Sequence, residues 1–442
     1  MNWEELLSIK RFGQEYYFDA KKHERTEYQR DYDRIIFSSP FRRLQNKTQV
    51  FPLPGSVFVH NRLTHSLEVA SVGRSIGEIV GRTLRDKYPE SEAHFEEIGS
   101  IVSASCLAHD MGNPPFGHSG EEAISTYFSE GKGNYLQELV DNENERWSDF
   151  TYFEGNANAI RLLMHQFRGR RKGGFVMTYS TLASIVKYPY SSELSGSKNK
   201  FGFFSSEEED YRKIATSLGI IKLNETPLKY VRYPLVYLVE AADDICYQVM
   251  DIEDAHRLNL ITTEKAQELF LNFFNKEKKE RRLKILSQID DINEQIAYLR
   301  ASVIGQLVAE CSGVFIENEF KILDGKFEGS LIKGISKQSV EAYKECSCFA
   351  QEQIYRSKDV LDVELAGYRI IDFLLDTFIK AALTPEQSYS KLLLDRIPEQ
   401  YETNAPSYYG KIQSILDYIS AMTDVYALDI YRKLTGIGIP NI

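Results

Sequence analysis

The sequence predicts an all-α protein, and three observations support this. Apolar residues recur at helical spacing in most of the chain. Alternation that is typical of strands occurs only in short runs such as Thr48 to Phe58, where Pro52, Pro54 and Gly55 interrupt it, so we expect a loop or one small β-hairpin there. Third, a Gly/Pro-rich stop follows a strongly apolar helical run near residue 108. The clearest helical runs are Val69, Val72, Ile76, Ile79 and Val80, and Leu235, Leu238, Ala242, Ile245 and Val249.

The chain divides into two regions by the kind of residue that each concentrates. Residues 1–260 contain the clustered histidines and carboxylates, and we expect them to form a catalytic core. Residues 261–442 are long amphipathic segments without such clusters, so we expect a helical region packed on that core. Three polar stretches, 131–148, 191–210 and 398–410, are predicted to be surface excursions.

Composition restricts the classes of protein that fit. A chain of 442 residues with a net charge of −11 can bury a large core and lacks a general affinity for nucleic acid or anionic membranes. The segment RGRRK at 168–172 is a local basic patch, which we interpret as a solvated loop. No signal peptide or clean transmembrane span is expected, and five cysteines without CxxC spacing indicate reduced thiols. These features predict a cytoplasmic protein.

Three of the eight histidines lie in two short polar segments, NRLTHSLEV with His65 and HDMGNPPFGHSGEE with His109 and His118. In the second segment an apolar helix ends at the dipeptide His109-Asp110, because Gly112 and the prolines after it stop the helix. Two adjacent ligands at a helix end can point into one cavity. Imidazole with carboxylate is a usual pairing for a divalent metal, although a lone histidine is more often a structural residue.

A third cluster lies in the apolar segment PLVYLVEAADDICYQVMDIEDA. Asp243, Tyr247 and Asp251 are spaced i, i+4 and i+8, so they share one face of a helix. Carboxylates that are flanked by Leu, Val, Ala and Ile need a cation or a hydrogen-bonding partner. A solvated acidic face is the alternative, and the apolar neighbours make it the poorer explanation.

The pattern H…HD…D is that of the HD superfamily, and the surrounding words resemble one branch of it, the deoxyguanosinetriphosphate triphosphohydrolase family. The matching segments occur in the family's order between Phe41 and Tyr247. They are FRRLQNKTQVFPL, NRLTHSLEV, HDMGNPPFGHSGEE, FEGNANAIRLL, LASIVKYP and EAADDICY, with DYISAMTDVYALDIY as a weaker echo at 417–431. The echo has Ala421 where the family pattern has glycine.

The resemblance implies a role for twelve residues of this chain. It implies metal ligation by His65, His109, Asp110 and Asp243, and catalytic proton transfer by His118 with Glu121 as its acidic partner. Substrate contacts are implied for Gln49, Arg62, Lys187, Tyr188, Tyr247 and Asp251. Gln49, Tyr247 and Asp251 would face the sugar, and Arg62, Lys187 and Tyr188 the phosphates. The cofactor implied is one divalent ion, Mn or Mg.

The activity that the resemblance implies is hydrolysis of a deoxynucleoside triphosphate, dGTP among others, to deoxynucleoside and inorganic triphosphate. A nucleotide or single-stranded DNA effector and a homo-oligomer such as a hexamer are the partners it suggests, with no membrane. Two alternatives remain open at this point. One is an HD phosphohydrolase that acts on another nucleotide, and the other is a nucleotide-sensing or single-strand-binding protein with a vestigial site.

Overall fold

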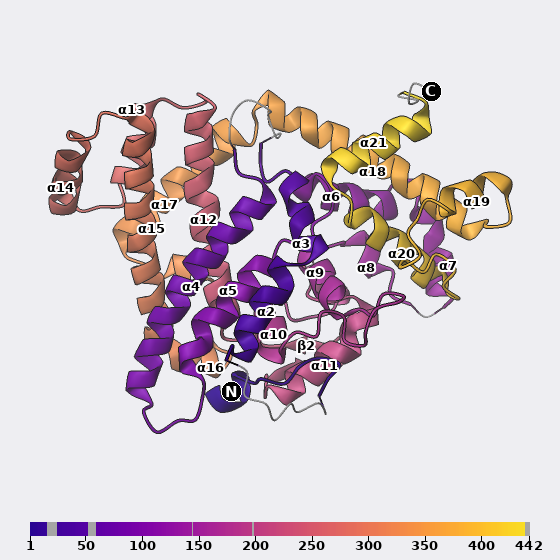
Figure 1. The fold of residues 1–442 in the computed structure, drawn as a ribbon, viewed down its shortest axis with the longest axis horizontal. Coiled ribbons are helices and arrows are strands. Elements are labelled where there is room, and N and C mark those ends of the chain that lie inside the picture. Colours follow the sequence, from indigo (N-terminus) through magenta and orange to yellow (C-terminus); the bar gives the residue numbers. More distant parts are fainter. Residues whose placement is uncertain (16–23, 52–58, 144, 197–198, 438–442) are drawn as a thin grey trace.

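The computed structural model describes residues 1–15, 24–51, 59–143, 145–196 and 199–437. Within these ranges the protein is all-α, as predicted, with one two-stranded sheet (Figure 1). The helices before the sheet are α1 (Trp3–Leu6), α2 (Glu27–Ile36), α3 (Ser39–Arg43), α4 (Arg62–Lys87), α5 (Ile98–Ala108), α6 (Gly117–Ser129), α7 (Gln137–Asp141), α8 (Ser148–Thr151), α9 (Gly155–Met164), α10 (Tyr179–Ile185) and α11 (Glu208–Ser217). Those after it are α12 (Val236–Arg257), α13 (Thr263–Leu271), α14 (Lys276–Leu286), α15 (Ile292–Glu317), α16 (Glu319–Leu323), α17 (Lys337–Phe349), α18 (Lys358–Leu383), α19 (Ser388–Leu394), α20 (Tyr408–Ser420) and α21 (Asp424–Thr435).

The described residues contain one small hairpin, which the sequence did not predict. Strands β1 (Lys222–Asn224) and β2 (Lys229–Tyr230) pair antiparallel just before α12. Of the segment proposed for a hairpin, residues 52–58 lie outside the described residues. Its ends are joined by a single antiparallel bridge between Thr48 and Asn61.

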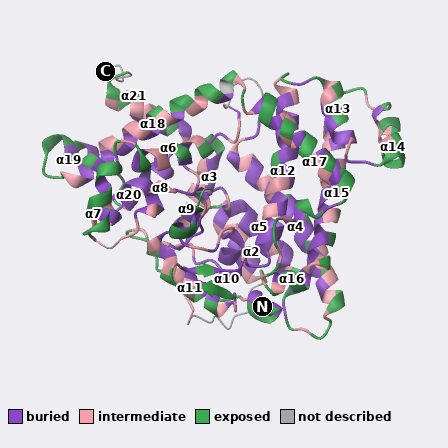
Figure 2. Ribbon diagram, turned by 180° about the vertical axis from the view of Figure 1, so that it is seen from behind, coloured by how far each residue is buried: buried purple, intermediate pink, exposed green. Residues whose placement is uncertain are grey.

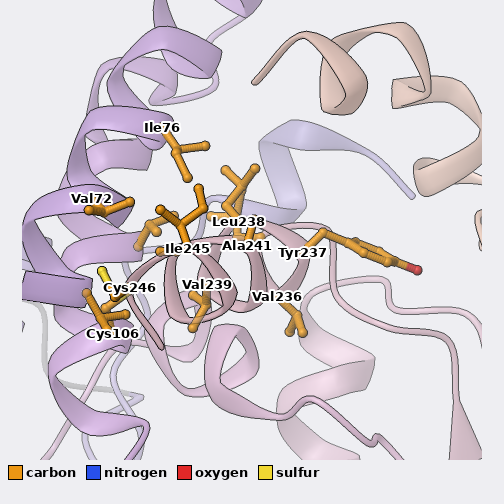
Figure 3. Packing of buried hydrophobic residues seen from close by; sticks show 14 of the residues in the cluster. Val72, Ile76, Cys106, Val236, Tyr237, Leu238, Val239, Ala241, Ile245 and Cys246 are labelled. Carbon is orange, nitrogen blue, oxygen red and sulfur yellow. The ribbon is translucent and has the colours of Figure 1, made fainter. Parts of the chain in front are cut away.

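The core around the site is the packing of α4, α5 and α12. Figure 3 shows apolar side chains from these three helices meeting, with Val72 and Ile76 of α4 beside Cys106 of α5 and Ile245 of α12. Helices α4 and α5 approach closely because α4 carries glycine at its contact face. A Cβ on Gly77 would lie 2.8 Å from the Cα of Gly99, which real Cβ atoms do not tolerate.

Two hydrophobic cores fill the described part of the chain. The first joins α4, α5 and α12 to α13, α15 and α17. The second joins α6, α7 and α8 to α18, α20 and α21. Figure 2 shows buried residues in both halves. Each core therefore combines segments from both sides of residue 260, and the division of the chain at that residue stays a prediction.

The stretches predicted as surface excursions are only partly exposed. Phe201, Phe203 and Phe204 are fully buried, and so is Leu136, while Tyr401 is nearly so. The prediction was wrong for these residues because apolar anchors are interspersed among the Ser, Gly and Glu that dominate the local composition. The loop at 168–172 is exposed, as expected.

Among the described helices, α15 is the one whose length and apolar composition would allow it to cross a membrane, judged by these two properties alone. It packs on α4 and α12, and Leu299, Val303 and Leu307 lie in the first core. The five cysteines are unpaired, as the sequence predicted.

A buried ion-pair network joins α9 to α20. The guanidinium of Arg161 donates from Nε and Nη2 to the two carboxylate oxygens of Asp417, each at 2.8 Å, and from Nη1 to Glu207 at 2.6 Å. All three side chains are nearly inaccessible to solvent.

We expect Arg161→Met to lower the free energy of unfolding by about 3–5 kcal/mol, because it leaves two buried carboxylates without their cation. Arg25→Met is the matched control, since Arg25 pairs with Asp33 at the surface and its loss should change stability by about 0–1 kcal/mol. Urea unfolding followed by circular dichroism measures both. Equal stability of the two variants would contradict a structural role for the network.

Candidate metal centre and active site

A cavity of about 250 Å³ opens between α4, α6, α10 and α12, beside the end of α5. Ten of the twelve sequence-predicted site residues line it, and Tyr188 and Asp251 do not. The ten are Gln49, Arg62, His65, His109, Asp110, His118, Glu121, Lys187, Asp243 and Tyr247.

The local sequence explains why Arg62 and His65 lie on the first turn of α4. The side chain of Asn61 accepts a hydrogen bond from Thr64 N, and the Thr64 side chain accepts one from Asn61 N. This capping box starts α4 at Arg62. Arg62 and His65 therefore lie on the first turn of α4, where both are buried and line the cavity.

His65, His109 and Asp243 are the group of described residues whose ligand atoms converge, all within 4.8 Å of one another. Asp243 Oδ1 lies 3.1 Å from His65 Nε2 and 3.6 Å from His109 Nε2. Asp110 Oδ1 is 3.6 Å from His109 Nε2, on the adjoining side. The structure thus brings three of the four predicted ligands together, from α4, α12 and the end of α5, and places Asp110 beside His109.

The hydrogen bonds around this cluster fit a divalent ion. His109 Nδ1 donates to the carbonyl oxygen of Cys106 at 2.6 Å, which leaves Nε2 facing the carboxylates. Burial lowers the pKa of His109, but the carboxylates of Asp110 and Asp243 outweigh it and raise the pKa to about 9. Burial opposes ionisation of Asp243 as well, yet the imidazoles of His109 and His65 hold its pKa well below the ordinary value. The cluster therefore favours positive charge at its centre. Two imidazoles with two carboxylates can bind Mn or Mg, but they select these ions less strictly than a set of oxygen ligands alone would.

Two side chains besides His109 contact the carboxylate of Asp110. Arg62 Nη1 lies 2.8 Å from Asp110 Oδ2, and Asn113 Nδ2 donates to Asp110 Oδ1 at 2.6 Å. Burial raises the pKa of Asp110, but the charge of Arg62 outweighs it and keeps the carboxyl ionised. Asp110 is therefore fixed as an anion beside the imidazoles.

His118 and Glu121 form a second, separate pair on the first turns of α6. His118 Nδ1 lies 3.0 Å from Glu121 Oε2, and Glu121 Oε1 accepts a hydrogen bond from Gly155 N at 2.7 Å. Glu121 is buried, whereas the His118 side chain is 71% exposed. The hydrogen bond to Glu121 raises the pKa of His118 above its ordinary value. His118 is thus an accessible imidazole with a fixed orientation, as a group that exchanges protons requires.

The loop between the metal ligands and His118 is anchored by the C-terminal region. Phe116 has a φ of +65°, a conformation that is uncommon for a residue with a side chain. Asp424 of α21 accepts from Phe116 N at 2.9 Å and from Thr48 N at 2.8 Å. Lys47 donates to the carbonyl oxygens of Asn113 and Ser420 at 2.5 and 2.7 Å. The sequence analysis assigned no role to these residues, although Ser420 and Asp424 belong to the weaker echo at 417–431.

Lys200 and Glu154 are two further cavity residues that the sequence analysis missed. Lys200 Nζ lies 2.8 Å from Glu154 Oε1 and 3.8 Å from Glu121 Oε2. Lys200 comes from the stretch predicted to be a surface excursion, so local composition hid it. Glu154 belongs to the word FEGNANAIRLL, which was a signal that could have identified it.

The remaining predicted substrate contacts differ in their surroundings. Lys187 Nζ lies 3.3 Å from Glu240 Oε1 at the cavity wall, and the ring of Tyr188 is directed toward Tyr190. Tyr247 follows Asp243 on the cavity face of α12, as the spacing predicted. One turn further, buried Asp251 accepts a hydrogen bond from the hydroxyl of Tyr355, which sequence reasoning did not find.

Comparison with known proteins places this arrangement in a class. Residues 62–222 match the family model described as the HD domain, and residues 334–433 match the phosphohydrolase-associated domain. The first match spans the elements that carry His65, His109, Asp110 and His118. The chain therefore contains an HD domain, and its fold is that of an HD-domain hydrolase.

Full-length relatives narrow the class to a family. A deoxyguanosinetriphosphate triphosphohydrolase-like protein of Synechocystis is 36% identical over 99% of this chain and all of the relative, and one of Pseudomonas aeruginosa is 36% identical over the whole of both. A deoxyguanosinetriphosphate triphosphohydrolase of Yersinia enterocolitica is 32% identical over 92% of this chain and 93% of its own. The chain belongs to the deoxyguanosinetriphosphate triphosphohydrolase family.

Asp243→Ala should abolish stoichiometric binding of Mn, because it removes the carboxylate that lies closest to both imidazoles. Metal content after dialysis, read by elemental analysis, tests this independently of any activity. Asp244→Ala is the matched control, since Asp244 is adjacent on α12 and does not line the cavity. Retention of one metal per chain in Asp243→Ala would show that the ligand assignment is wrong.

His118→Ala should lower kcat by roughly 10²–10⁴, the usual contribution of general acid–base catalysis, while metal content stays at the wild-type level. His94→Ala, which removes an exposed histidine that does not line the cavity, serves as control. An unchanged kcat in His118→Ala would assign the proton transfer to another group.

Proposed function

We propose that this protein hydrolyses deoxynucleoside triphosphates, dGTP among them, to deoxynucleoside and inorganic triphosphate with the help of one Mn or Mg ion. The observation that carries the proposal is the pairing of two sites in one cavity. A donor set for a divalent ion lies at the start of α4, the end of α5 and within α12, and an oriented His/Glu pair lies on α6. The names of the full-length relatives supply the substrate class.

The residues around the cavity account for the demands of the reaction. A divalent ion held by His65, His109, Asp110 and Asp243 would supply Lewis-acid polarisation at the α-phosphate. Arg62 would bind phosphate oxygens while it holds Asp110 in place, because a guanidinium has donors for both. The ammonium of Lys187 neutralises charge from the α10 side of the cavity, with the phenol of Tyr188 next to it.

His118 would transfer the proton during attack on the α-phosphorus. Its Nδ1 is occupied by Glu121, and its Nε2 lies 3.3 Å from Oε1 of the exposed Glu122. Nε2 is therefore the nitrogen that would serve the water or the leaving 5′ oxygen, once it exchanges Glu122 for that partner. Glu121 keeps the imidazole in one orientation and stabilises its protonated form. The backbone N–H of Gly155 in turn fixes Glu121.

The sugar would lie along α12 beyond the metal ligand. Tyr247 follows Asp243 by one turn, so its ring meets the sugar near C2′, and Gln49 and Asp251 are assigned to the 3′ side. Asp251 bonds to Tyr355 in this structure, so contact with a 3′-hydroxyl requires Asp251 to share or exchange that partner. The proposal also includes a cytoplasmic location and a homo-oligomeric state for this enzyme.

Incubation with each deoxynucleoside triphosphate, separately and mixed, with Mn and then Mg, is the direct test. We expect deoxynucleoside and inorganic triphosphate after chromatographic separation. The mixture is included because an activating nucleotide would be missed with single substrates. Pyrophosphate or orthophosphate as product would favour a phosphohydrolase of another kind, and no turnover of any nucleotide would favour a binding protein with a vestigial site.

Tyr247→Ala should narrow the preference for deoxyribonucleotides, because the ring offers a 2′-hydroxyl no hydrogen-bond partner. Burying that hydroxyl unpaired costs about 1–3 kcal/mol, which corresponds to roughly fivefold to 160-fold in kcat/KM. The ratio of kcat/KM for dGTP and GTP, and for dATP and ATP, measures the effect. Asp251→Asn is the matched variant and should lower kcat/KM for ribonucleotides and deoxyribonucleotides alike. An equal deoxyribonucleotide-to-ribonucleotide ratio of kcat/KM in wild type and Tyr247→Ala would contradict the steric account.

A further inference from the structure

A buried ion cluster other than the candidate metal site joins α4 to α12. It consists of His60, which directly precedes the N-cap Asn61 of α4, together with Glu68 of α4 and Asp254 of α12. The backbone N–H of His60 donates to Asp254 Oδ2 at 2.8 Å, and its ring Nδ1 donates to Asp254 Oδ1 at 2.8 Å. Its ring Nε2 lies 3.1 Å from Glu68 Oε2. His60 therefore bridges the two helices with both of its ring nitrogens.

His60 carries a positive charge in this cluster. Burial opposes that charge, but the hydrogen bonds to Asp254 and Glu68 outweigh it and raise the pKa of His60 to about 10. Both ring nitrogens are then protonated at neutral pH, as two carboxylate acceptors require. Replacing a buried ion pair by apolar side chains of similar size is often neutral or stabilising. Stability alone therefore does not account for the cluster.

The cluster and the candidate metal site hold α4 and α12 together at two points. At the first point, His65 Nε2 of α4 lies 3.1 Å from Asp243 Oδ1 of α12. At the second, His60 meets Asp254, eleven residues further along α12. At about 1.5 Å per residue, the two points are roughly 16 Å apart along the axis of α12. The stretch of α12 between them is therefore fixed against the start of α4 at both ends.

Residues proposed to bind the sugar and the phosphates lie between these two points. On α12, Tyr247, Asp251 and Asp254 are spaced i, i+4 and i+7, so they share one face of the helix. At the start of α4, Arg62 lies in the chain between the two bridging histidines. The contact between His60 and Asp254 therefore sets how far Arg62 stands from Asp251.

His60 also offsets a charge that would disturb Asp251. Burial raises the pKa of Asp251 to about 7, against the hydrogen bond from Tyr355, which lowers it. The nearby carboxylate of Asp254 adds to the rise, and the charge of His60 opposes it. Asp254 can therefore anchor the start of α4 without forcing Asp251 into its neutral form. The ionised form of Asp251 is the stronger hydrogen-bond acceptor for a hydroxyl group.

We infer that His60 is a positioning residue for recognition of the 3′-hydroxyl of the substrate. By bridging Asp254 and Glu68, it holds the start of α4, with Arg62, in a fixed place relative to Asp251. His60 does not line the cavity, so it acts through Asp251 and not on the substrate itself. The inference rests on the proposed function, because it concerns the sugar site of that reaction.

Two substrates that differ only in the 3′-hydroxyl test this role. Wild type should prefer dGTP to 2′,3′-dideoxyguanosine triphosphate by about tenfold or more in kcat/KM, because the hydroxyl bonds to a charged acceptor. His60→Gln should narrow that preference by about fivefold or more, because Asp251 and Arg62 are no longer held in register. A general disturbance of the fold would instead lower kcat/KM for both nucleotides by the same factor. An unchanged ratio in His60→Gln, or no preference in wild type, would overturn the inference.

His256→Gln is the matched control for this experiment. His256 lies two residues after Asp254 on α12, but its Nε2 bonds to Thr263 rather than to α4, and it does not line the cavity. Its ratio of kcat/KM for the two nucleotides should stay within about twofold of wild type.

Asp254→Asn is the second variant, and it decides the question if His60→Gln does not fold. It keeps the shape of the side chain but removes one of the two acceptors that hold His60. The preference for dGTP over the dideoxynucleotide should then narrow by about threefold or more. A wild-type ratio in Asp254→Asn would overturn the inference.

Metal content separates this role from an effect on the candidate metal site. His60→Gln should retain the wild-type amount of Mn by elemental analysis, because His65 and Asp243 keep their contact. Loss of the metal would show that His60 acts through His65, which would overturn the inference.

A binding measurement keeps the test independent of catalysis. If wild type hydrolyses no nucleotide, the proposed function is wrong, and both nucleotides can be titrated into the intact protein with Mn because nothing consumes them. The ratio of the two Kd values should then narrow in His60→Gln in the same way. Equal ratios of Kd in wild type and His60→Gln would overturn the inference.

Discussion

Two imidazoles and two carboxylates meet where α4, α5 and α12 cross, and this charged cluster is the constraint on which the rest of the structure depends. Charged groups that leave water must be paired or bind a metal. Here each one has a fixed partner: Cys106 O for His109, Arg62 for Asp110, and both imidazoles for Asp243. The close approach of α4 to α5, made possible by Gly77, brings His65 and His109 within reach of each other.

The C-terminal region supports the same centre from outside. Asp424 fixes Phe116 in its left-handed conformation, Lys47 joins Asn113 to Ser420, and Arg161 joins α9 to α20. These contacts reach the loop between Asp110 and His118 rather than the metal ligands themselves. Distant segments thus fix the distance between the candidate metal ligands and the His118/Glu121 pair, on which the proposed catalysis by positioning depends.

The sequence predicted the parts of the site that local patterns specify. The end of α5 at His109 follows from Gly112 and the prolines after it, and the cavity face of α12 follows from the spacing of Asp243 and Tyr247. Lys200, Tyr355 and Asp424 could not be found in this way, because each reaches the site only through tertiary contacts with a segment far away in the chain. The same reason explains the buried phenylalanines at 201–204, which lie among residues of polar composition. The hairpin at 222–230 was missed because its two short strands carry no clear alternation.

Attack of water on the α-phosphorus is the central claim, and hydrolysis of dGTP in ¹⁸O-labelled water tests it most directly. The account predicts that mass spectrometry finds one ¹⁸O atom in inorganic triphosphate and none in deoxyguanosine, because the bond between the α-phosphorus and the 5′ oxygen is the one that breaks. Label in the 5′-hydroxyl of deoxyguanosine, or deoxyguanosine monophosphate as the labelled product, would contradict it.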